Sequence, residues 1–297
     1  MKNIFKNGIC ILFFYSYSCI TTSTQNFITT NFFYNFALVR DLSNAFENSL
    51  KLNSPIIPID LHLAKKQHEN YITILKELIP NVIQLEASHN HPDCNFIEDT
   101  AIIINDIAVI SRMGAIERRG EEIAIADAIK TLKNKKIIYI QAPGTMDGGD
   151  ILYTGNHLFV GFSARTNEDA FKQLKEIFRD KIEVVGIPVS QRLHLKSLVS
   201  CFDFQTLIIA DTNAGKEIKK YIEELTNGLY KCILVPDSTA SNVLRIGSNL
   251  IIQEGFLETE KILKKLCDEN SIKLVKLNMS ELIKADGALT CGCIVFN

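Results

Sequence analysis

Apolar residues recur with helical spacing in five segments of the chain. In each segment they fall on one face of a helix, while polar residues occupy the opposite face. The midpoints of these segments are separated by about 45 to 55 residues, which indicates a repeated structural unit. The five predicted helices cover residues 64–78, 121–132, 167–178, 215–225 and 258–267.

Short runs of β-branched residues lie between these segments and are interrupted by turn residues. Residues 101–104 and 107–110 flank Asn105-Asp106, and 244–246 and 250–252 flank Gly247-Ser248-Asn249, so both pairs are predicted to be β-hairpins. A strand, a hairpin and a helix that recur about five times predict a ring of similar units, that is, a propeller of α/β modules. The alternative is a doubly wound sheet, in which strands and helices alternate singly without hairpins.

The composition fits a globular chain with a large core. The sequence has 297 residues, of which 46% are hydrophobic, and its formal net charge is −2. Because acidic and basic residues are nearly balanced, no basic surface for phosphate backbones is expected, and nucleic acid is not a predicted partner. The sequence does not determine an oligomeric state.

The first segment resembles a signal peptide. Lys2 and Lys6 precede an apolar run over residues 9–20, and no acidic residue occurs before Asp41. The run is too short for a stable membrane span, which needs about 20 apolar residues. A disordered extension is the alternative. We therefore divide the chain into an N-terminal extension, residues 1–35, and a single domain, residues 36–297.

The cysteines bear on the cellular compartment. Eight cysteines are dispersed through the chain and do not form the framework of a small secreted scaffold. Most are expected to be reduced thiols, so the predicted localisation is cytoplasmic. The secretory pathway is the alternative if residues 1–25 act as a signal peptide.

Two acidic segments precede predicted strands. Asp93, Glu98 and Asp99 place three carboxylates within seven residues, directly before the strand at 101–104. Neighbouring carboxylates in a cleft require a cation, which a guanidinium or a metal would supply. In Met146-Asp147-Gly148-Gly149-Asp150, two glycines let the backbone turn tightly between two acids. The alternatives are a solvated acidic loop and a structural turn.

A histidine and a cysteine are candidates for reactive groups. His194 lies between apolar neighbours, where its environment can shift its pKa towards that of a proton shuttle. Cys291 lies where a glycine-containing turn meets an apolar strand. A free thiol has a pKa of about 8.5, so it needs a nearby positive charge, from His194 or from a cationic substrate, to become a nucleophilic thiolate. The alternatives are a core histidine and a buried thiol.

A zinc site is the competing interpretation of the cysteines and histidines. His89, His91 and Cys94 would join Cys291 and Cys293, but the HxH and CxC spacings differ from those of structural zinc fingers. No required metal is therefore predicted, and zinc bound to Cys291 would act as an inhibitor because it removes the free thiolate. The remaining histidines lack evident partners and are expected at the surface: His62, His68 and His157.

Seven blocks, in the same order and at similar spacing, resemble the dimethylarginine dimethylaminohydrolases, which are guanidine-modifying enzymes of the pentein superfamily. The likeness runs from about residue 36 to the C-terminus. It implies a fold of five pseudosymmetric α/β modules, the five-bladed pentein propeller. The blocks are NFIEDTAI (95–102), RMGAIERRGEE (112–122), MDGGDILYTG (146–155), VGFSARTN (160–167), LHLKS (193–197), ILVPDSTASN (233–242) and KADGALTC (284–291).

The resemblance also implies roles for individual residues. Cys291 would be the nucleophile and His194 the general acid and base, with Asp147 orienting the imidazole. Glu98 and Asp99 would bind the guanidinium nitrogens. The other implied substrate contacts are Arg118 and Arg165 to the carboxylate, Asp93 to the amino group, and Leu42, Phe96 and Ser163 as further contacts.

The implied activity needs no cofactor. The resemblance implies a small-molecule substrate, N-omega-methylated arginine, which would be hydrolysed to citrulline and an alkylamine through a covalent thiouronium on Cys291. Such an activity would relieve inhibition of nitric oxide synthesis. The alternatives are a pentein that acts on arginine or a related guanidine, and a catalytically silent binding protein that kept the fold.

Overall fold

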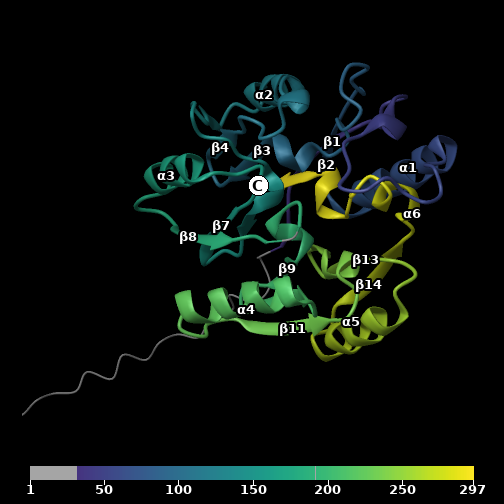
Figure 1. Cartoon of the computed structure of the whole chain (residues 1–297), viewed down its shortest axis with the longest axis vertical. Coiled ribbons are helices and arrows are strands. Elements are labelled where there is room, and N and C mark those ends of the chain that lie inside the picture. Colours follow the sequence, from purple (N-terminus) through teal and green to yellow (C-terminus); the bar gives the residue numbers. More distant parts are fainter. Residues whose placement is uncertain (1–31, 191) are drawn as a thin grey trace, which may run out of the picture.

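The chain folds into a ring of five small sheets with helices on the outside (Figure 1). The computed structural model describes residues 32–190 and 192–297. Each sheet has three strands, and among the strands of these described residues none is shared between two sheets. The C-terminus lies near the centre of the ring, while the long helices lie at its periphery. The predicted five-module α/β propeller is thereby confirmed, and the doubly wound sheet is excluded.

Four modules are continuous in sequence and share one construction. An antiparallel hairpin is followed by a helix, which returns the chain to a third strand parallel to the second. The elements of these modules are β3 (Ala101–Ile104), β4 (Ile107–Ile110), α2 (Glu121–Lys130) and β5 (Lys136–Tyr139); β6 (Ile151–Tyr153), β7 (His157–Phe162), α3 (Glu168–Ile177) and β8 (Glu183–Pro188); β9 (Val199–Asp203), β10 (Thr206–Ala210), α4 (Asn213–Leu225) and β11 (Lys231–Val235); β12 (Leu244–Ile246), β13 (Asn249–Gln253), α5 (Leu257–Glu269) and β14 (Lys273–Leu277).

The remaining module joins the two ends of the domain. Strand β1 (Phe36–Arg40) is followed by α1 (Leu61–Leu78) and pairs in parallel with β2 (Asn81–Leu85). Its other edge pairs antiparallel with β15 (Ile294–Phe296), the last strand of the chain. The C-terminal strand thus supplies the hairpin partner that the other modules find within their own sequence, and this pairing closes the ring.

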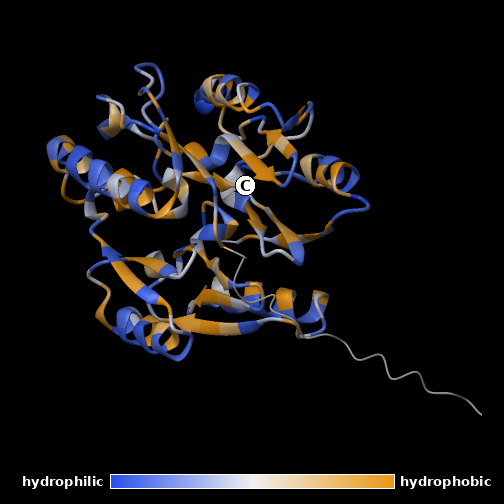
Figure 2. Cartoon of the chain, turned by 180° about the vertical axis from the view of Figure 1, so that it is seen from behind, coloured by the Kyte–Doolittle hydropathy of each residue, from blue (hydrophilic) through white to orange (hydrophobic). Residues whose placement is uncertain are grey.

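Local sequence explains where these elements begin and turn. Asn105 and Gly247 adopt left-handed conformations, with φ of 54° and 53°, at the two hairpin turns, and Asn and Gly tolerate this region best. Asn167 and Thr212 cap α3 and α4 through side-chain oxygens that accept backbone N–H hydrogen bonds. In Figure 2 the strands are largely apolar, whereas the outer helices carry polar residues on one side.

A short 3-10 turn precedes the first hairpin strand of every module. In the module that joins the two chain ends, this strand is β15. Helix-like turns η2 (Ile97–Thr100), η4 (Gly148–Asp150), η5 (Leu195–Ser197), η6 (Thr239–Ser241) and η7 (Thr290–Gly292) occupy equivalent positions in the five modules. Turn η2 contacts both η4 and η7, and η4 contacts η5. The turns therefore lie around the centre of the ring and bring together residues from distant parts of the sequence.

Two of the histidines expected at the surface are buried, so that prediction was wrong. His68 is 2% exposed, and its Nε2 lies 2.8 Å from the carbonyl oxygen of Arg40. His157 is 8% exposed, and its Nδ1 lies 2.6 Å from the hydroxyl of Tyr230. The partners come from other strands or modules, so they could not be recognised from neighbouring residues.

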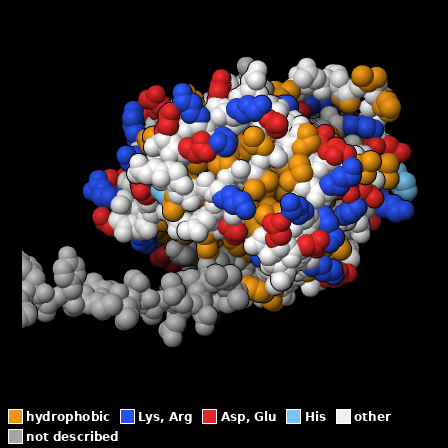
Figure 3. Space-filling model, turned by 90° about the horizontal axis from the view of Figure 1, so that it is seen from below, with side chains coloured by type: hydrophobic (Ala, Val, Ile, Leu, Met, Phe, Trp, Pro, Cys, Tyr) orange, Lys and Arg blue, Asp and Glu red, His pale blue; other side chains and the backbone are white. Residues whose placement is uncertain are grey.

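The signal-like N-terminal run lies outside the described residues. The backbone N–H of Gly247 donates to the carbonyl of Phe32, and β1 begins at Phe36. The division between an extension and a catalytic domain at residue 35 stays a prediction. None of the helices within residues 32–190 and 192–297 combines the length and apolarity required to cross a bilayer. On the face drawn in Figure 3, acidic and basic side chains are interspersed around apolar ones.

Candidate active site

His194 is held between two buried carboxylates. Its Nε2 lies 3.1 Å from Oδ2 of Asp147, and its Nδ1 lies 3.9 Å from Oδ1 of Asp99. Asp147 comes directly before η4, Asp99 is in η2 and His194 comes directly before η5, so the contact of three central turns brings them together. The other oxygen of Asp147 accepts the backbone N–H of Gly114, which fixes the carboxylate that faces the imidazole.

The two carboxylates shift the charge state of the imidazole. Burial alone would lower the pKa of His194, but the negative charge of Asp99 and the hydrogen bond to Asp147 raise this pKa to about 9. Burial opposes ionisation of Asp99, yet His194 and Arg118 lower the pKa of its carboxyl to about 2. At neutral pH the site therefore holds an imidazolium beside the ionised carboxylate of Asp99, and the imidazolium can donate a proton.

The two glycines of η4 are required by close packing and not by an unusual backbone. The backbone turns tightly here, as predicted, in a 3-10 turn in which neither Gly148 nor Gly149 has a positive φ. A Cβ on Gly149 would lie 2.6 Å from Nδ1 of His194 and 2.8 Å from Oδ1 of Asp99. A Cβ on Gly148 would lie 2.0 Å from the carbonyl oxygen of Glu98. Glycine thus allows η4 to approach both the imidazole and η2.

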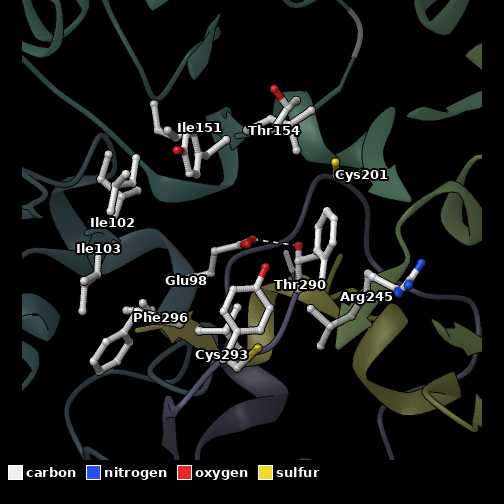
Figure 4. A pocket seen from close by; sticks show the side chains of 18 of the residues that line it. Glu98, Ile102, Ile103, Ile151, Thr154, Cys201, Arg245, Thr290, Cys293 and Phe296 are labelled. Atoms are coloured by element: carbon white, nitrogen blue, oxygen red, sulfur yellow. Dashed lines mark hydrogen bonds between the residues drawn. The ribbon is translucent and has the colours of Figure 1, made fainter. Parts of the chain in front are cut away.

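Glu98 forms a buried ion pair. Its Oε1 lies 2.5 Å from Nζ of Lys196, and its Oε2 accepts a hydrogen bond of 2.9 Å from the hydroxyl of Thr290. Burial raises the pKa of Glu98, although Lys196 and Thr290 oppose this effect. Figure 4 shows the Glu98–Thr290 hydrogen bond beside a cavity of about 400 Å³.

This cavity is distinct from the cluster around His194. Its walls are formed mainly by the first strands of the modules, and Glu98, Lys196 and Thr290 also line it. Cys291 and His194 do not contribute to the lining. The Glu98–Lys196 ion pair therefore borders both the reactive side chains and the central cavity.

Cys291 lies in η7, directly after Thr290. Its side chain is partly buried and packs against the apolar cluster that also contains Leu42 and Phe96. Burial raises the pKa of the Cys291 thiol, and the negative charges of Glu98 and Asp99 raise it further. In the absence of an additional cation the thiol is therefore protonated at neutral pH, and a cation placed beside these carboxylates would favour the thiolate.

The two arginines predicted to bind a carboxylate have different environments. Arg118 is buried, and its guanidinium lies 2.5 Å from Asp99 and 2.8 Å from Glu121. Its Nη2 also donates to the carbonyl of Phe96. Arg165 lies 3.7 Å from Oδ2 of Asp147, but its buried Nη1 has no hydrogen-bonding partner in the described part of the chain. Arg165 is consequently the arginine with free hydrogen-bonding capacity.

The other predicted substrate contacts border this cluster or support it. Asp93 is 5% exposed, and both of its carboxylate oxygens accept the backbone N–H of Leu50. Burial raises the pKa of Asp93. The hydroxyl of Ser163 donates to Oδ2 of Asp150 at 2.6 Å, so its proton is already used within the protein. Burial raises the pKa of Asp150 to about 6.

The residues proposed for a zinc site do not come together. His91 instead contacts Ser88 and the carbonyl of Arg119, and the thiol of Cys94 contacts the backbone of Ser88. Among residues 32–190 and 192–297, the one group of three or more possible metal ligands within 4.8 Å of one another consists of Asp99, Asp147 and His194. These three residues already form ion pairs with one another, through both ring nitrogens of His194.

Sequence reasoning missed several residues that build the site. Lys196 and Thr290 neutralise and bind Glu98, Asp150 accepts the backbone N–H of Leu195, and Asn242 contacts Thr290. All four of these residues lie within blocks that carry the resemblance, but no local feature indicated their partners. Each contact joins two different modules, so only the closed ring reveals it.

The chain matches known proteins over most of its length. The family model described as arginine deiminase matches residues 87–297. The N(G),N(G)-dimethylarginine dimethylaminohydrolase of Streptomyces coelicolor is 29% identical over 259 residues, which cover 86% of this chain and 94% of that protein. A solved structure of the Pseudomonas aeruginosa enzyme, a cysteine mutant complexed with citrulline, is 25% identical with a TM-score of 0.80, and the alignment covers 89% of this chain and 100% of that one.

A more distant structure agrees in fold. The N-terminal domain of ArgZ, covalently bound to a reaction intermediate, has a TM-score of 0.70 at 19% identity and is covered over 97% of its length. The resemblance predicted from the sequence blocks and the prediction of a hydrolase are confirmed by the family model and the relatives. Since the match to the family model spans the four complete modules and the final turn and strand, well over half of the sequence, the chain belongs to the arginine deiminase family.

Proposed function

We propose that this protein hydrolyses N-omega-methylated arginine to citrulline and dimethylamine or methylamine. The single observation that carries the proposal is the position of Glu98 and Asp99. Both carboxylates are buried, and the negative charge of each raises the pKa of the Cys291 thiol. A flat cation such as a guanidinium matches this arrangement, because it would offer charged N–H donors to both acids.

Substrate binding would activate the nucleophile. The negative charges of Glu98 and Asp99 oppose loss of the proton from Cys291 in the free protein. A guanidinium bound to the same carboxylates offsets part of their negative charge and so lowers the pKa of the thiol. The reactive thiolate would thus form mainly when a substrate is present, with the guanidinium carbon already held near the sulfur.

The first half of the reaction forms a covalent intermediate. The Cys291 thiolate adds to the guanidinium carbon, and protonated His194 gives its proton to the dimethylated nitrogen. The C–N bond then breaks, dimethylamine leaves and an S-alkylthiouronium remains on Cys291. Asp147 would hold the imidazole in place and stabilise its charged form, in the manner of the acidic member of a catalytic triad.

Hydrolysis completes the cycle. His194, now neutral, removes a proton from water, and the resulting hydroxide equivalent attacks the thiouronium carbon. The C–S bond breaks, the Cys291 thiolate leaves and citrulline is released. His194 keeps the proton that it took from water and is again an imidazolium. The product passes its remaining hydroxyl proton to the departing thiolate, which replaces the proton that Cys291 had released to solvent, so each turnover consumes one water and requires no oxidant, reductant or cofactor.

The amino-acid part of the substrate would be recognised by groups at the edge of the cluster. Arg165 would bind the carboxylate through its unpartnered Nη1, whereas Arg118 would do so only by exchanging its contacts with Asp99 or Glu121. Asp93 would bind the amino group after releasing the N–H of Leu50. Leu42, Phe96 and Ser163 would form the remaining contacts.

The proposal is tested by citrulline production from purified protein. Asymmetric dimethylarginine should be hydrolysed with a larger kcat/KM than arginine, and Cys291→Ser should abolish turnover while the thermal unfolding temperature stays the same. A preference for arginine would assign the site to another guanidine. Failure to release citrulline from either compound, together with no covalent trapping of Cys291 by a guanidine-like electrophile, would identify a silent binding protein.

We also propose that the protein acts in a reducing compartment such as the cytoplasm. The described cysteines Cys94, Cys201, Cys232, Cys267, Cys291 and Cys293 are all free thiols. Free thiols are typical of reducing environments. Fractionation of cells that express the full chain tests this, because recovery in the secreted fraction would contradict it.

A further inference from the structure

Asn242 connects the turn that follows His194 to the turn that carries Cys291. Its Nδ2 lies 3.0 Å from the carbonyl oxygen of Lys196 and 3.0 Å from Oγ1 of Thr290. Its Oδ1 accepts the backbone N–H of Thr290, also at 3.0 Å. Lys196 follows His194 by two residues and Thr290 directly precedes Cys291, so one side chain is hydrogen-bonded to a close sequence neighbour of each member of the reactive pair.

The module that contains Asn242 supplies no reacting group. Turns η2, η4, η5 and η7 carry or adjoin Glu98, Asp147, His194 and Cys291, whereas η6 leads only to Asn242. The side chain of Asn242 is 2% exposed and uses both ends of its amide within the protein. It therefore has no capacity left for a substrate, and its bonds link two neighbouring modules.

The backbone of Asn242 is fixed on both sides. The hydroxyl of Ser200 donates to the carbonyl of Ser241 at 2.5 Å and accepts the N–H of Val243 at 3.1 Å. Ser200 is itself 1% exposed. The amide is thus presented from a rigid segment, which is the property required of a group that sets a distance between two others.

The contacts form a closed circuit of hydrogen bonds. Asn242 donates to the Lys196 carbonyl and to Thr290, Thr290 donates to Glu98, and Glu98 accepts from the ammonium of Lys196. A change at Asn242 would therefore affect the position of Glu98 as well as that of η7. In a buried network of this kind, the removal of one member leaves several polar groups without partners.

We propose that Asn242 is a positioning residue that sets the alignment of Cys291 with His194. This inference rests on the proposed function, in which the thiolate attacks a carbon while the imidazolium protonates its leaving group. Both events must occur on one guanidinium, so a small displacement of either turn lowers the rate of reaction more than the affinity for substrate.

The test compares Asn242→Ala with Gln253→Ala. Gln253 is 1% exposed and its Nε2 donates to the carbonyl of Thr239, so the control removes a buried amide bonded to the same turn, η6, without touching η5 or η7. Asn242→Leu, which nearly conserves volume, replaces the alanine variant if the latter does not fold. Each variant is assayed for kcat and KM with asymmetric dimethylarginine, and for the pH dependence of Cys291 alkylation by iodoacetamide, followed by peptide mass.

We expect Asn242→Ala to lower kcat by about 10- to 100-fold with KM changed less than about threefold, and to shift the pH midpoint of Cys291 alkylation. Gln253→Ala should change neither. The inference is overturned if the two variants have the same kcat within about twofold and the same alkylation midpoint. If the wild-type protein releases no citrulline, the proposed function fails, and the alkylation midpoint alone decides the role of Asn242.

Discussion

Lys196 and Glu98 form an ion pair whose two side chains are each 11% exposed, with 2.5 Å between Nζ and Oε1. The two residues are 98 positions apart in sequence, and their contact joins two different modules. Lys196 is also close enough to Cys291 to lower the pKa of its thiol slightly, against the opposing charge of Glu98. The lysine therefore links two modules and also offsets part of the negative charge near Cys291.

Replacing Lys196 by methionine should destabilise the protein by about 3 to 5 kcal/mol, because an unpaired buried carboxylate remains. Loss of the ammonium would raise the pKa of Glu98 further, because Lys196 opposes the effect of burial, and KM for a cationic substrate would rise. Urea denaturation and steady-state kinetics measure the two effects. In Lys196→Met combined with Glu98→Gln, most of the stability should return while KM stays high. A double variant as unstable as the single one would contradict this explanation.

Gly149→Ala should inactivate the enzyme without unfolding it. The added methyl group would meet His194 and Asp99 at 2.6 and 2.8 Å, so the imidazole must move away from the carboxylate. We expect kcat to fall by about 100-fold, as for other displacements of about 1 Å. Gly228→Ala is the control, since a Cβ at Gly228 would have no atom within 4 Å. Its only cost is the strain of placing alanine at a φ of +70°. Equal activity of the two variants would reject the steric argument.

The sequence predicted the repeated units well because their signals are local. The hairpin at Ala101–Ile104 and Ile107–Ile110 is bounded by Asn105-Asp106 as predicted, and the five predicted helices correspond to α1 to α5. The short helix α6 (Ser280–Ile283) was not predicted. Helix α1 begins three residues earlier than predicted, at Leu61, because the carboxylate of Asp60 caps it. Helical periodicity locates the buried face, whereas the first turn depends on its cap.

The site was predicted only in part, since its contacts cross between modules. Asp99, Asp147 and His194 come together within 4.8 Å although they span nearly one hundred residues. The sequence resemblance indicated these three, but it did not indicate that Arg118 is bound to Glu121 or that Asn242 bonds to Thr290. Periodicity along one segment contains no information about which residue of another module will face it.

Asp147→Asn should lower kcat by about 1,000- to 10,000-fold, the range typical of the acidic residue in a catalytic triad. The amide would retain the size of the carboxylate, but it cannot accept from both His194 and the N–H of Gly114. Steady-state citrulline release measures the effect, and near-UV circular dichroism checks that the fold is retained. A decrease of less than about tenfold would show that the imidazole is oriented by another group, of which Asp99 is the nearest candidate.

The raised pKa of His194 predicts how stability depends on pH. This group has a pKa of about 9 in the folded protein, against about 6.5 in an unfolded chain, so the folded state holds the proton more tightly. Its stabilising contribution is therefore complete below about pH 6.5 and is lost as the pH rises through about 9. Asp99 does not contribute to this window, because its pKa is lowered to about 2 and its effect is lost only in strong acid.

His194→Gln, which does not titrate, is the matched variant for this prediction. Urea denaturation at several pH values between about 6 and 9 should show that the difference in unfolding free energy between wild type and variant narrows as the pH rises. The buried acids that remain, Asp99 and Asp147, should make the variant less stable at the lower end of this range because they lose their cation. A difference that stays constant across the range would mean that His194 is neutral in the folded protein, and then the proton for the leaving amine must come from another group.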